Sequence, residues 1–348
     1  MDVAELDYPL AEERIAQHPV EPRDAARLLV DRGPATPPEH RHVHDLPTLV
    51  RPGDLVVLNA TRVLPARLRL RKATGGAAEV LLLEERADGT WEALVRPSRR
   101  LRPGTRLEAG PDLSVVVGDD LGADDGRRAV TLEHEGDLLV ALGRHGEVPL
   151  PPYVHEVLAV PERYQTVYAD RPGSVAAPTA GLHLTAEVLR GVEAAGARIE
   201  RVELVVGLGT FRPIAADRVE DHVMHSERYD VGQEVLDAAA AAERTIAVGT
   251  TTVRALESAA RLGAGRGRTD LFLRPGSSFE VVDALMTNFH LPRSSLLAMV
   301  EAFVGPRWRE LYAVATDAGY RLLSFGDAMW LERGAPEAQR GAPEAPRA

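Results

Sequence analysis

A series of short strand-like runs between residues 68 and 150 constrains the fold of this chain more than any other feature. The runs are separated by Gly, Pro and Asp, no convincing helical pattern interrupts them, and they lie at residues 79–83, 91–95, 113–117 and 129–132. After the proline cluster at 149–152, helical patterns alternate with apolar strands, which is typical of an α/β domain. We therefore predict an all-β domain, 68–150, inserted into a discontinuous α/β domain made of 1–67 and 151–332.

The predicted α/β units rest on capping residues and apolar runs. Thr185 begins a helix that Gly196 ends, and the strand 199–206 follows it. Further units are predicted as a strand at 55–58, a helix at 233–242, a strand at 245–248, a helix after Thr251 or Thr252, and a helix from Ser294 or Ser295 to Phe303. The tail, 333–348, repeats Gly-Ala-Pro-Glu-Ala, a composition that cannot form a packed core, and we expect it to be disordered.

Residue usage excludes several classes of protein. The 348 residues are 45% hydrophobic and include no cysteine, so disulfides, thiolate nucleophiles, iron–sulfur clusters and cysteine zinc sites are excluded. Lys72 is the only lysine, and because Ala73 follows it, the chain has no phosphate-binding loop that ends in Gly-Lys-Ser/Thr. The acidic start lacks a signal-peptide pattern, and no run approaches the roughly 20 apolar residues of a membrane helix. We expect a soluble, cytoplasmic protein.

The charge of the chain is uneven. The formal net charge is −11, which argues against a general nucleic-acid coat. Between residues 51 and 110, however, twelve basic residues face seven acids, giving +5. This asymmetry indicates a phosphate-contacting surface around Arg96, Arg99, Arg100 and Arg102. The alternative interpretation is an ordinary solvated loop.

Several apparent motifs fail on inspection. The run 207–212 begins like a dinucleotide fingerprint, but Arg212 stands in place of its third glycine. His155-Glu156 lacks the second histidine of a helical zinc motif. Histidines alternate at 40, 42 and 44 without an accompanying carboxylate cluster. We therefore predict no bound metal.

Four polar blocks follow apolar strands or precede helices, where open α/β sheets and barrels bind ligands. They are 59–62, 164–168 with 174–185, 209–213 with 224–227, and 249–254 with 283–292. Each contains small, hydroxyl, imidazole or carboxylate residues. A helix start within such a block exposes free amides that suit a carboxylate or phosphate. Taken singly, His183, His225 and His290 are as readily explained as hydrogen-bonded structural or surface residues.

Together these blocks resemble the S-adenosylmethionine:tRNA ribosyltransferase-isomerase family, QueA, of queuosine biosynthesis. The resemblance covers nearly the whole chain, and its most specific strings are 165–169, Gln-Thr-Val-Tyr-Ala, and 177–183, Ala-Pro-Thr-Ala-Gly-Leu-His. It implies a barrel-like α/β catalytic domain with a smaller β domain. It also implies transfer and isomerisation of the ribosyl group of S-adenosylmethionine onto 7-aminomethyl-7-deazaguanine in a tRNA anticodon. Epoxyqueuosine-tRNA, adenine and methionine would be the products, with S-adenosylmethionine consumed and no other cofactor.

The resemblance turns the blocks into candidate site residues. A base must remove a proton from the carbon beside the sulfonium, and departing adenine needs a proton or a strong hydrogen bond. The candidate catalytic residues are His183, His225, Glu227, Asp283 and His290. The candidate substrate-binding residues are Asn59, Thr61, Arg62, Gln165, Tyr168, Pro178, Thr179, Gly181, Gly209, Thr210, Thr250, Thr251, Arg254, Asn288 and Phe289. Among them, Tyr168 or Phe289 would stack on a base or on the cation, and Arg62 or Arg254 would bind a carboxylate or phosphate.

Four positions depart from the family pattern. Ala60 stands where the family usually has an acid, Glu147 where it has a histidine, Glu156 where it has an arginine, and Leu184 where it has a phenylalanine. Two alternatives therefore stay open. One is a diverged paralogue that uses S-adenosylmethionine on another nucleobase, and the other is a noncatalytic RNA-binding protein.

Overall fold

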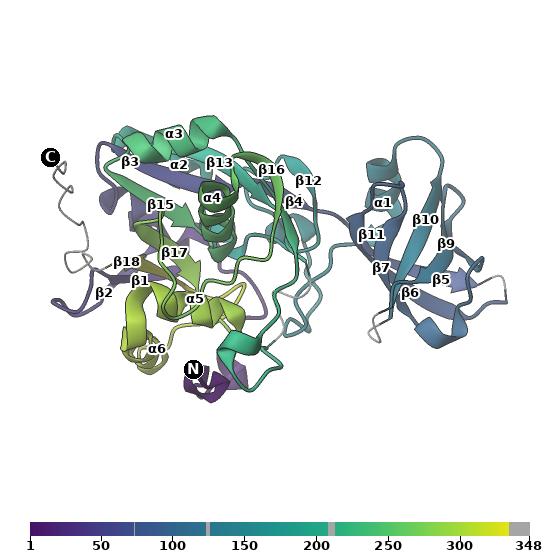
Figure 1. Cartoon of the computed structure of the whole chain (residues 1–348), viewed down its shortest axis with the longest axis horizontal. Coiled ribbons are helices and arrows are strands. Elements are labelled where there is room, and N and C mark those ends of the chain that lie inside the picture. The colour runs from purple at the N-terminus through teal and green to yellow at the C-terminus, as the bar shows by residue number, and fades with distance from the viewer. Residues whose placement is uncertain (73, 123–125, 208–212, 334–348) are drawn as a thin grey trace, which may run out of the picture.

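The computed structural model describes residues 1–72, 74–122, 126–207 and 213–333. They form a large α/β body and a smaller β-barrel beside it, joined by a narrow connection (Figure 1). The predicted disorder of the tail falls on 334–348, outside the described residues. Gly209 and Thr210, two of the predicted substrate-binding residues, also lie outside them.

A nine-stranded mixed sheet forms the centre of the body. Its four middle strands, β13, β3, β15 and β17, are parallel, whereas β14, β16, β2 and β18 each have antiparallel partners. In spatial order the strands are β16 (Gly265–Thr269), β14 (Glu227–Val231), β13 (Arg198–Leu204), β3 (Asp54–Asn59), β15 (Arg244–Val248), β17 (Ala284–Asn288), β18 (Ala328–Glu332), β1 (Arg27–Asp31) and β2 (Glu39–His42).

The expected barrel shape of this α/β domain is wrong for the described residues. Their sheet is open and ends at β16 and β2, which do not pair with each other. The physical reason is that antiparallel strands interrupt the parallel series on both sides, so the repeated crossovers that close a parallel barrel are missing. The edge strand β2 carries polar side chains that are exposed or half-buried, which discourages further pairing.

Alternating side chains of the sheet bury two apolar layers. On β3, Leu55 and Val57 face one core cluster, while Val56 and Leu58 face the other. The first face is covered by α3 (Gln233–Ala241), α4 (Thr250–Leu262), α5 (Ser295–Val304) and α6 (Trp308–Asp317). The second is covered by α2 (Ala186–Ala194) and by 3-10 helices at Val43–Thr48 and Thr179–His183.

The predicted caps are observed. The Thr185 hydroxyl accepts a hydrogen bond from Val188 N at 3.2 Å, and Ser294 does the same for Leu297 N at 3.2 Å. The helix α4 begins two or three residues earlier than predicted, because Gly249 with φ of 93° allows the chain to turn sharply out of β15.

The remaining short elements connect the body. A two-stranded parallel sheet pairs β4 (Thr61–Val63) with β12 (Arg171–Ser174). The other 3-10 helices are Val3–Leu6, Glu12–Arg14, Arg23–Ala25, Ser98–Arg100, Pro161–Tyr164, Val219–Asp221 and Gly305–Arg307. No helix among the described residues has the length and apolar character needed to cross a membrane.

The smaller domain is a closed six-stranded barrel with its own apolar core. Its strands follow the order β5 (Arg67–Lys72), β6 (Ala77–Glu85), β7 (Trp91–Arg96), β10 (Arg127–His134), β9 (Leu113–Asp120) and β8 (Arg106–Gly110), and β8 pairs back onto β5. A seventh short strand, β11 (Gly146–Glu147), also pairs with β5. Closure removes the free edges of an all-β domain.

The expectation that no helix interrupts this region is wrong. The helix α1 (Leu138–His145) follows β10, and the Asp137 side chain caps it by accepting from Val140 N at 3.0 Å. Only Ala141 and Leu142 of this eight-residue helix are buried. So short an apolar stripe gives little helical periodicity in the sequence.

Candidate active site

Polar side chains from distant segments meet at one edge of the nine-stranded sheet. Asn59 is the last residue of β3, Asn288 is the last of β17, and Gly249 follows β15 directly. Glu227 begins β14, which is antiparallel to β13 and so starts beside the carboxyl end of β13. The carboxyl ends of parallel strands are where open α/β sheets bind ligands.

Asn59 ties three elements together at this edge. Its amide nitrogen donates to Leu204 O at 3.0 Å and to Thr251 Oγ1 at 3.1 Å. Its side-chain oxygen accepts from Thr61 N at 3.2 Å and from Leu204 N at 3.3 Å. Since both amide protons and the oxygen are engaged and the residue is buried, Asn59 positions β13 and the first turn of α4.

A buried ion pair lies next to this network. Arg254, 2% exposed, donates through Nη1 to Glu227 Oε2 and through Nε to Leu271 O at 3.2 Å. Glu227 Oε1 also accepts from Gly207 N at 3.0 Å. The second terminal nitrogen of Arg254, Nη2, is buried without a hydrogen-bond partner among the described residues. A buried guanidinium with an unused donor is suited to an anionic oxygen of a ligand.

The first turn of α4 supplies hydroxyls beside the ion pair. Thr250 and Thr251 are buried at the start of this thirteen-residue helix, four and three residues before Arg254. Thr252 donates its hydroxyl proton to Val248 O at 2.6 Å, whereas Thr251 Oγ1 accepts from Asn59 Nδ2 at 3.1 Å. The positive end of the α4 dipole and the Arg254 guanidinium thus both favour negative charge at this edge.

Asn288 fixes the protonation pattern of His183. The Asn288 amide nitrogen donates to Leu323 O at 3.2 Å, and its oxygen accepts from the Thr179 hydroxyl at 2.9 Å. The same nitrogen therefore donates to His183 Nε2, at 3.0 Å. Because Nε2 accepts, the neutral imidazole carries its proton on Nδ1.

Burial keeps two of the three candidate histidines neutral. It lowers the pKa of His183 to about 3, and the positive charges of Arg321, Arg23 and Arg163 act in the same direction. Burial alone lowers the pKa of His290 to about 3. At neutral pH both imidazoles are therefore uncharged. They form hydrogen bonds but do not act as imidazolium acids.

His290 lies two residues beyond Asn288. Its Nε2 shares a hydrogen bond with the Thr287 hydroxyl at 2.9 Å, and its backbone N donates to the Tyr312 hydroxyl at 2.9 Å. It lines a small cavity of about 30 Å³ together with Thr179, Asn288 and seven further residues. This space suits one or two waters, not a nucleoside.

The sequence interpretation missed part of the lining of this cavity. Tyr153 and Ser324 share a hydrogen bond of 2.6 Å there, although they are 171 residues apart. No motif links them, so only the fold reveals their proximity. Thr287 had a usable signal, since it stands one residue before a predicted site asparagine at the end of an apolar strand.

Other predicted binding residues have mainly structural contacts. The Gln165 side chain pairs with the backbone of Val63, donating to its O at 2.9 Å and accepting from its N at 3.0 Å. Tyr168 is buried against Gly181, where an added Cβ would meet the tyrosine oxygen at 1.9 Å. Pro178 precedes the 3-10 helix of Gly181 and accepts from its backbone N at 2.9 Å.

Phe289 is a core residue and not an exposed stacking platform. It is fully buried and makes edge-to-face contacts with Tyr312, at 5.1 Å between ring centroids, and with Tyr320, at 5.9 Å. Stacking on a substrate base would require one of these rings to move away.

The structure does not bring three of the predicted residues into this cluster. Asp283 precedes β17, so it lies about 16 Å along the strand from Asn288, at the opposite edge, where its Oδ2 accepts from Thr245 N at 2.9 Å. His225 and Arg62 are exposed. In the chain, His225 stands two residues before Glu227 of the buried ion pair.

The four arginines predicted to bind tRNA lie together on the barrel. Arg99 and Arg100 form the 3-10 helix between β7 and β8, with Arg96 before it and Arg102 after it. All four are exposed, and none of them has an ion-pair partner among the described residues. The single lysine joins them, because Lys72 Nζ donates to Arg100 O at 3.4 Å.

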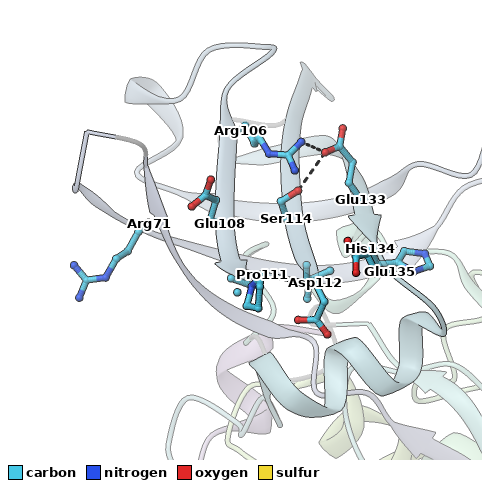
Figure 2. A pocket seen from close by; sticks show the side chains of 12 residues that line it. Arg71, Arg106, Glu108, Pro111, Asp112, Ser114, Glu133, His134 and Glu135 are labelled. Atoms are coloured by element: carbon cyan, nitrogen blue, oxygen red, sulfur yellow. Dashed lines mark hydrogen bonds and ion pairs between the residues drawn. The ribbon is translucent and has the colours of Figure 1, made fainter.

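A cavity of about 530 Å³ is in the barrel and not at the sheet edge. Figure 2 shows it on the face formed by β8, β9 and β10, with Arg106 directed at Glu133 and Arg71 pointing away from the other side chains. Glu133 also accepts from the Ser114 hydroxyl at 3.2 Å. Because it lies on a different domain from the sheet edge, this cavity is separate from the candidate active site.

Three of the four departures from the family pattern have local partners or packing. Glu147 pairs with Arg69 at 2.9 Å, and Glu156 meets His18 Nε2 at 2.5 Å, both at the surface. Leu184 is fully buried in the second core cluster. Ala60 is buried and follows Asn59 directly in the chain.

The fold and this edge define an α/β protein with an inserted β-barrel and a polar, anion-favouring site at the carboxyl ends of its parallel strands. Residues 3–331 match the family model described as "Queuosine biosynthesis protein". The chain belongs to this family, which confirms the resemblance predicted from the motifs.

Individual relatives agree with the family match. The chain is 53% identical over 335 residues to the S-adenosylmethionine:tRNA ribosyltransferase-isomerase of Rubrobacter xylanophilus, covering 96% of this chain and 98% of the relative. The enzyme of the same name from Thermus thermophilus is 52% identical over 340 residues, covering 93% and 97%. The crystal structure of the S-adenosylmethionine tRNA ribosyltransferase of Thermotoga maritima matches with a TM-score of 0.53 at 36% identity, covering 94% of this chain and 99% of that one.

Proposed function

We propose that this chain is an S-adenosylmethionine:tRNA ribosyltransferase-isomerase of queuosine biosynthesis. The observation that carries the proposal is the full-length similarity to enzymes of that name, at 53% identity over 335 residues. S-adenosylmethionine and tRNA are its substrates. We further propose that the acceptor is 7-aminomethyl-7-deazaguanine in the anticodon, and that the reaction takes place in the cytoplasm. S-adenosylmethionine is consumed, and no step is assigned to another cofactor.

The methionine carboxylate of S-adenosylmethionine binds Arg254 Nη2 and the start of α4 in this proposal. The support is the unused, buried Nη2 donor and the adjacent Thr250 and Thr251 hydroxyls. Glu227 holds the guanidinium in place and supplies negative charge near the sulfonium. In this arrangement, the carboxylate of S-adenosylmethionine contacts Arg254, and its sulfonium lies near Glu227, the partner of Arg254 in the buried ion pair.

His183 and Asn288 act on the substrate without changing the charge of the imidazole. The support is the low pKa of His183 and the hydrogen bond that leaves its proton on Nδ1. Such an imidazole donates a neutral hydrogen bond to a ring nitrogen of departing adenine. His225, the exposed member of the three histidines, is the proposed base for the carbon beside the sulfonium.

The exposed arginines of the barrel bind the phosphates of tRNA in this proposal. Their support is the absence of ion-pair partners among the described residues, which leaves four guanidinium groups free on one loop. Neighbouring Lys72 adds a fifth cation. Phosphate contacts of this kind orient the RNA and do not read its sequence.

Release of adenine tests the proposed function. The protein is incubated with S-adenosylmethionine and with tRNA that carries the aminomethyl base, and adenine and modified tRNA are quantified by chromatography. We expect stoichiometric adenine and ribosylated tRNA only when both substrates are present. Adenine release that does not depend on this base would replace the proposal by the paralogue. Binding of tRNA without any product would replace it by the RNA-binding protein.

A further inference from the structure

Two histidines and an aspartate gather at the end of edge strand β2. His42 is the last residue of β2, and His44 and Asp45 belong to the following 3-10 helix, Val43–Thr48. Each offers one nitrogen or oxygen atom, and these three atoms lie within 4.8 Å of one another. The two imidazole rings are stacked, with their centroids 5.1 Å apart and their planes 6° apart.

Local structure holds the carboxylate in this position. Asp45 Oδ2 accepts from the backbone N of His42 at 3.0 Å, and Asp45 Oδ1 lies 3.8 Å from His44 Nε2. In the sequence, His40 alternates with His42 and His44. His40 is not part of the group that the structure brings together, and its Nδ1 is hydrogen-bonded to the Tyr320 hydroxyl at 2.9 Å.

The surrounding charges leave room for a cation. Arg41, next to His42 in the chain, is paired with Glu39 at 2.8 Å, and the guanidinium of Arg27, the residue opposite His42, lies 3.7 Å from the centre of the Tyr320 ring. Asp45 is thus available as the anionic member of the group. Both histidines are exposed, so an ion reaches them from solvent and keeps water in its remaining coordination positions.

We propose that His42, His44 and Asp45 form a binding site for a divalent transition-metal ion, with Zn²⁺ as the probe. Two imidazoles and one carboxylate match the donor preference of Zn²⁺ and of Ni²⁺ and Cu²⁺, whereas Mg²⁺ and Ca²⁺ prefer oxygen donors throughout. The sequence analysis predicted no metal because it found no carboxylate beside the histidines. The structure supplies one, that of Asp45.

This site is separate from the candidate active site. Both sites lie at the same ends of the strands, the side of the sheet where β17 and β2 end and β18 and β1 begin. His42 is opposite Arg27 at the start of β1, Leu28 is opposite Ala328, and Ala328 is opposite Asn288. Three strand spacings, about 14 Å, therefore separate His42 from Asn288. An ion bound at His42 touches no group that is bonded to Asn288.

A metal-competition experiment tests the proposal. Untagged full-length protein is titrated with Zn²⁺ in the presence of a chromophoric chelator, and the absorption of bound Co²⁺ is recorded separately. We expect one Zn²⁺ per chain at this site. His42→Ala, His44→Ala and Asp45→Asn should each weaken binding at least about tenfold, because each removes a donor or the negative charge. Asp45→Asn keeps an oxygen that can accept from His42 N.

His134→Ala is the matched control, because it removes another exposed histidine, from β10 of the barrel. It should leave the affinity and the Co²⁺ spectrum unchanged. Equal Zn²⁺ affinity of the wild type and of the His42→Ala/His44→Ala double variant would overturn the proposal, as would the absence of saturable binding by the wild type. Thermal unfolding of the metal-free variants shows that the substitutions leave the fold intact.

Discussion

Asn288 decides which nitrogen of His183 carries a proton, and this makes it a sensitive position. Its amide has three partners, Thr179, His183 and Leu323, which together determine its orientation. The sequence indicated that Asn288 and His183 belong to one site, since both follow apolar strands or precede helices. It did not indicate the direction of their hydrogen bond, because that depends on Leu323, 35 residues further along the chain.

Asn288→Asp should reverse the tautomer of His183. A carboxylate cannot donate to Nε2, so Nε2 takes the proton, and the new negative charge raises the pKa of the imidazole. We expect adenine release to fall about 100-fold, as small losses of orientation do in active sites. Histidine NMR titrations of wild type and variant check the cause. An unchanged His183 titration would contradict this account.

Substitutions of Arg254 should separate stability from substrate binding. Arg254→Gln leaves the Glu227 carboxylate buried without its guanidinium partner, and we expect a loss of about 3–5 kcal/mol in the free energy of unfolding. The double variant Arg254→Met/Glu227→Gln removes both charges and should recover most of that loss. Its affinity for S-adenosylmethionine should still be at least about tenfold weaker, measured by calorimetry. Full affinity in the double variant would exclude the proposed carboxylate site.

The buried histidines should make the protein acid-sensitive. His183 and His290 have ordinary pKa values of 6.5 when unfolded and about 3 when folded, so below pH 6.5 the unfolded chain binds protons that the folded chain does not. Their contribution to stability is complete above pH 6.5 and is lost as the pH falls toward 3, by about 1 kcal/mol per pH unit for each histidine. Urea unfolding at pH 7 and pH 5 measures this loss. It should be smaller in His290→Gln, and an equal loss there would rule out His290 as a contributor.

At the scale of elements, the sequence predicted helix starts correctly where a capping residue stands directly before the helix. Thr185 and Ser294 cap α2 and α5 as predicted, because a hydroxyl before an apolar stripe acts within three residues. The helix α1 was missed because it is short and its buried face consists of two residues. The strands β14, β16 and β18 were missed because they form by pairing with strands distant in sequence.

The cap of α5 can be measured directly. Ser294→Ala removes the acceptor of the Leu297 N–H bond, and we expect the free energy of unfolding to fall by about 1 kcal/mol. Ser294→Thr keeps a hydroxyl at this position and should lose much less. Equal destabilisation by the two variants would mean that the packing of the Ser294 side chain, and not its hydrogen bond to Leu297 N, stabilises this helix start.

At the scale of the whole molecule, the sequence predicted two kinds of structure in the right order but not the open form of the larger sheet. The barrel strands lie between Arg67 and Glu147, flanked by the strands of the mixed sheet. Strand order and edges depend on long-range pairings, and these have no local signature. The same limit applies to charge, since the sequence located the arginines while their lack of ion-pair partners needed the fold.

The barrel arginines should govern the salt dependence of tRNA binding. Replacing Arg96, Arg99, Arg100 and Arg102 by Gln should weaken binding and flatten the plot of log affinity against log salt, by up to about 0.7–0.9 for each phosphate that is no longer neutralised. Arg266→Gln is the control, because this exposed arginine is paired with Asp230 at 3.0 Å. An unchanged slope in the fourfold variant would place the RNA elsewhere.

The chain enters and leaves the barrel at neighbouring points, because Arg67 of β5 is paired with Glu147 of β11. The barrel is therefore an insertion whose first and last strands lie side by side where they join the larger body. A unit attached in this way can be exchanged between proteins, or lengthened at its far end, without changing the geometry of the chain where it returns. The position of the exposed barrel arginines can thus change during evolution without a change in the candidate active site at the sheet edge.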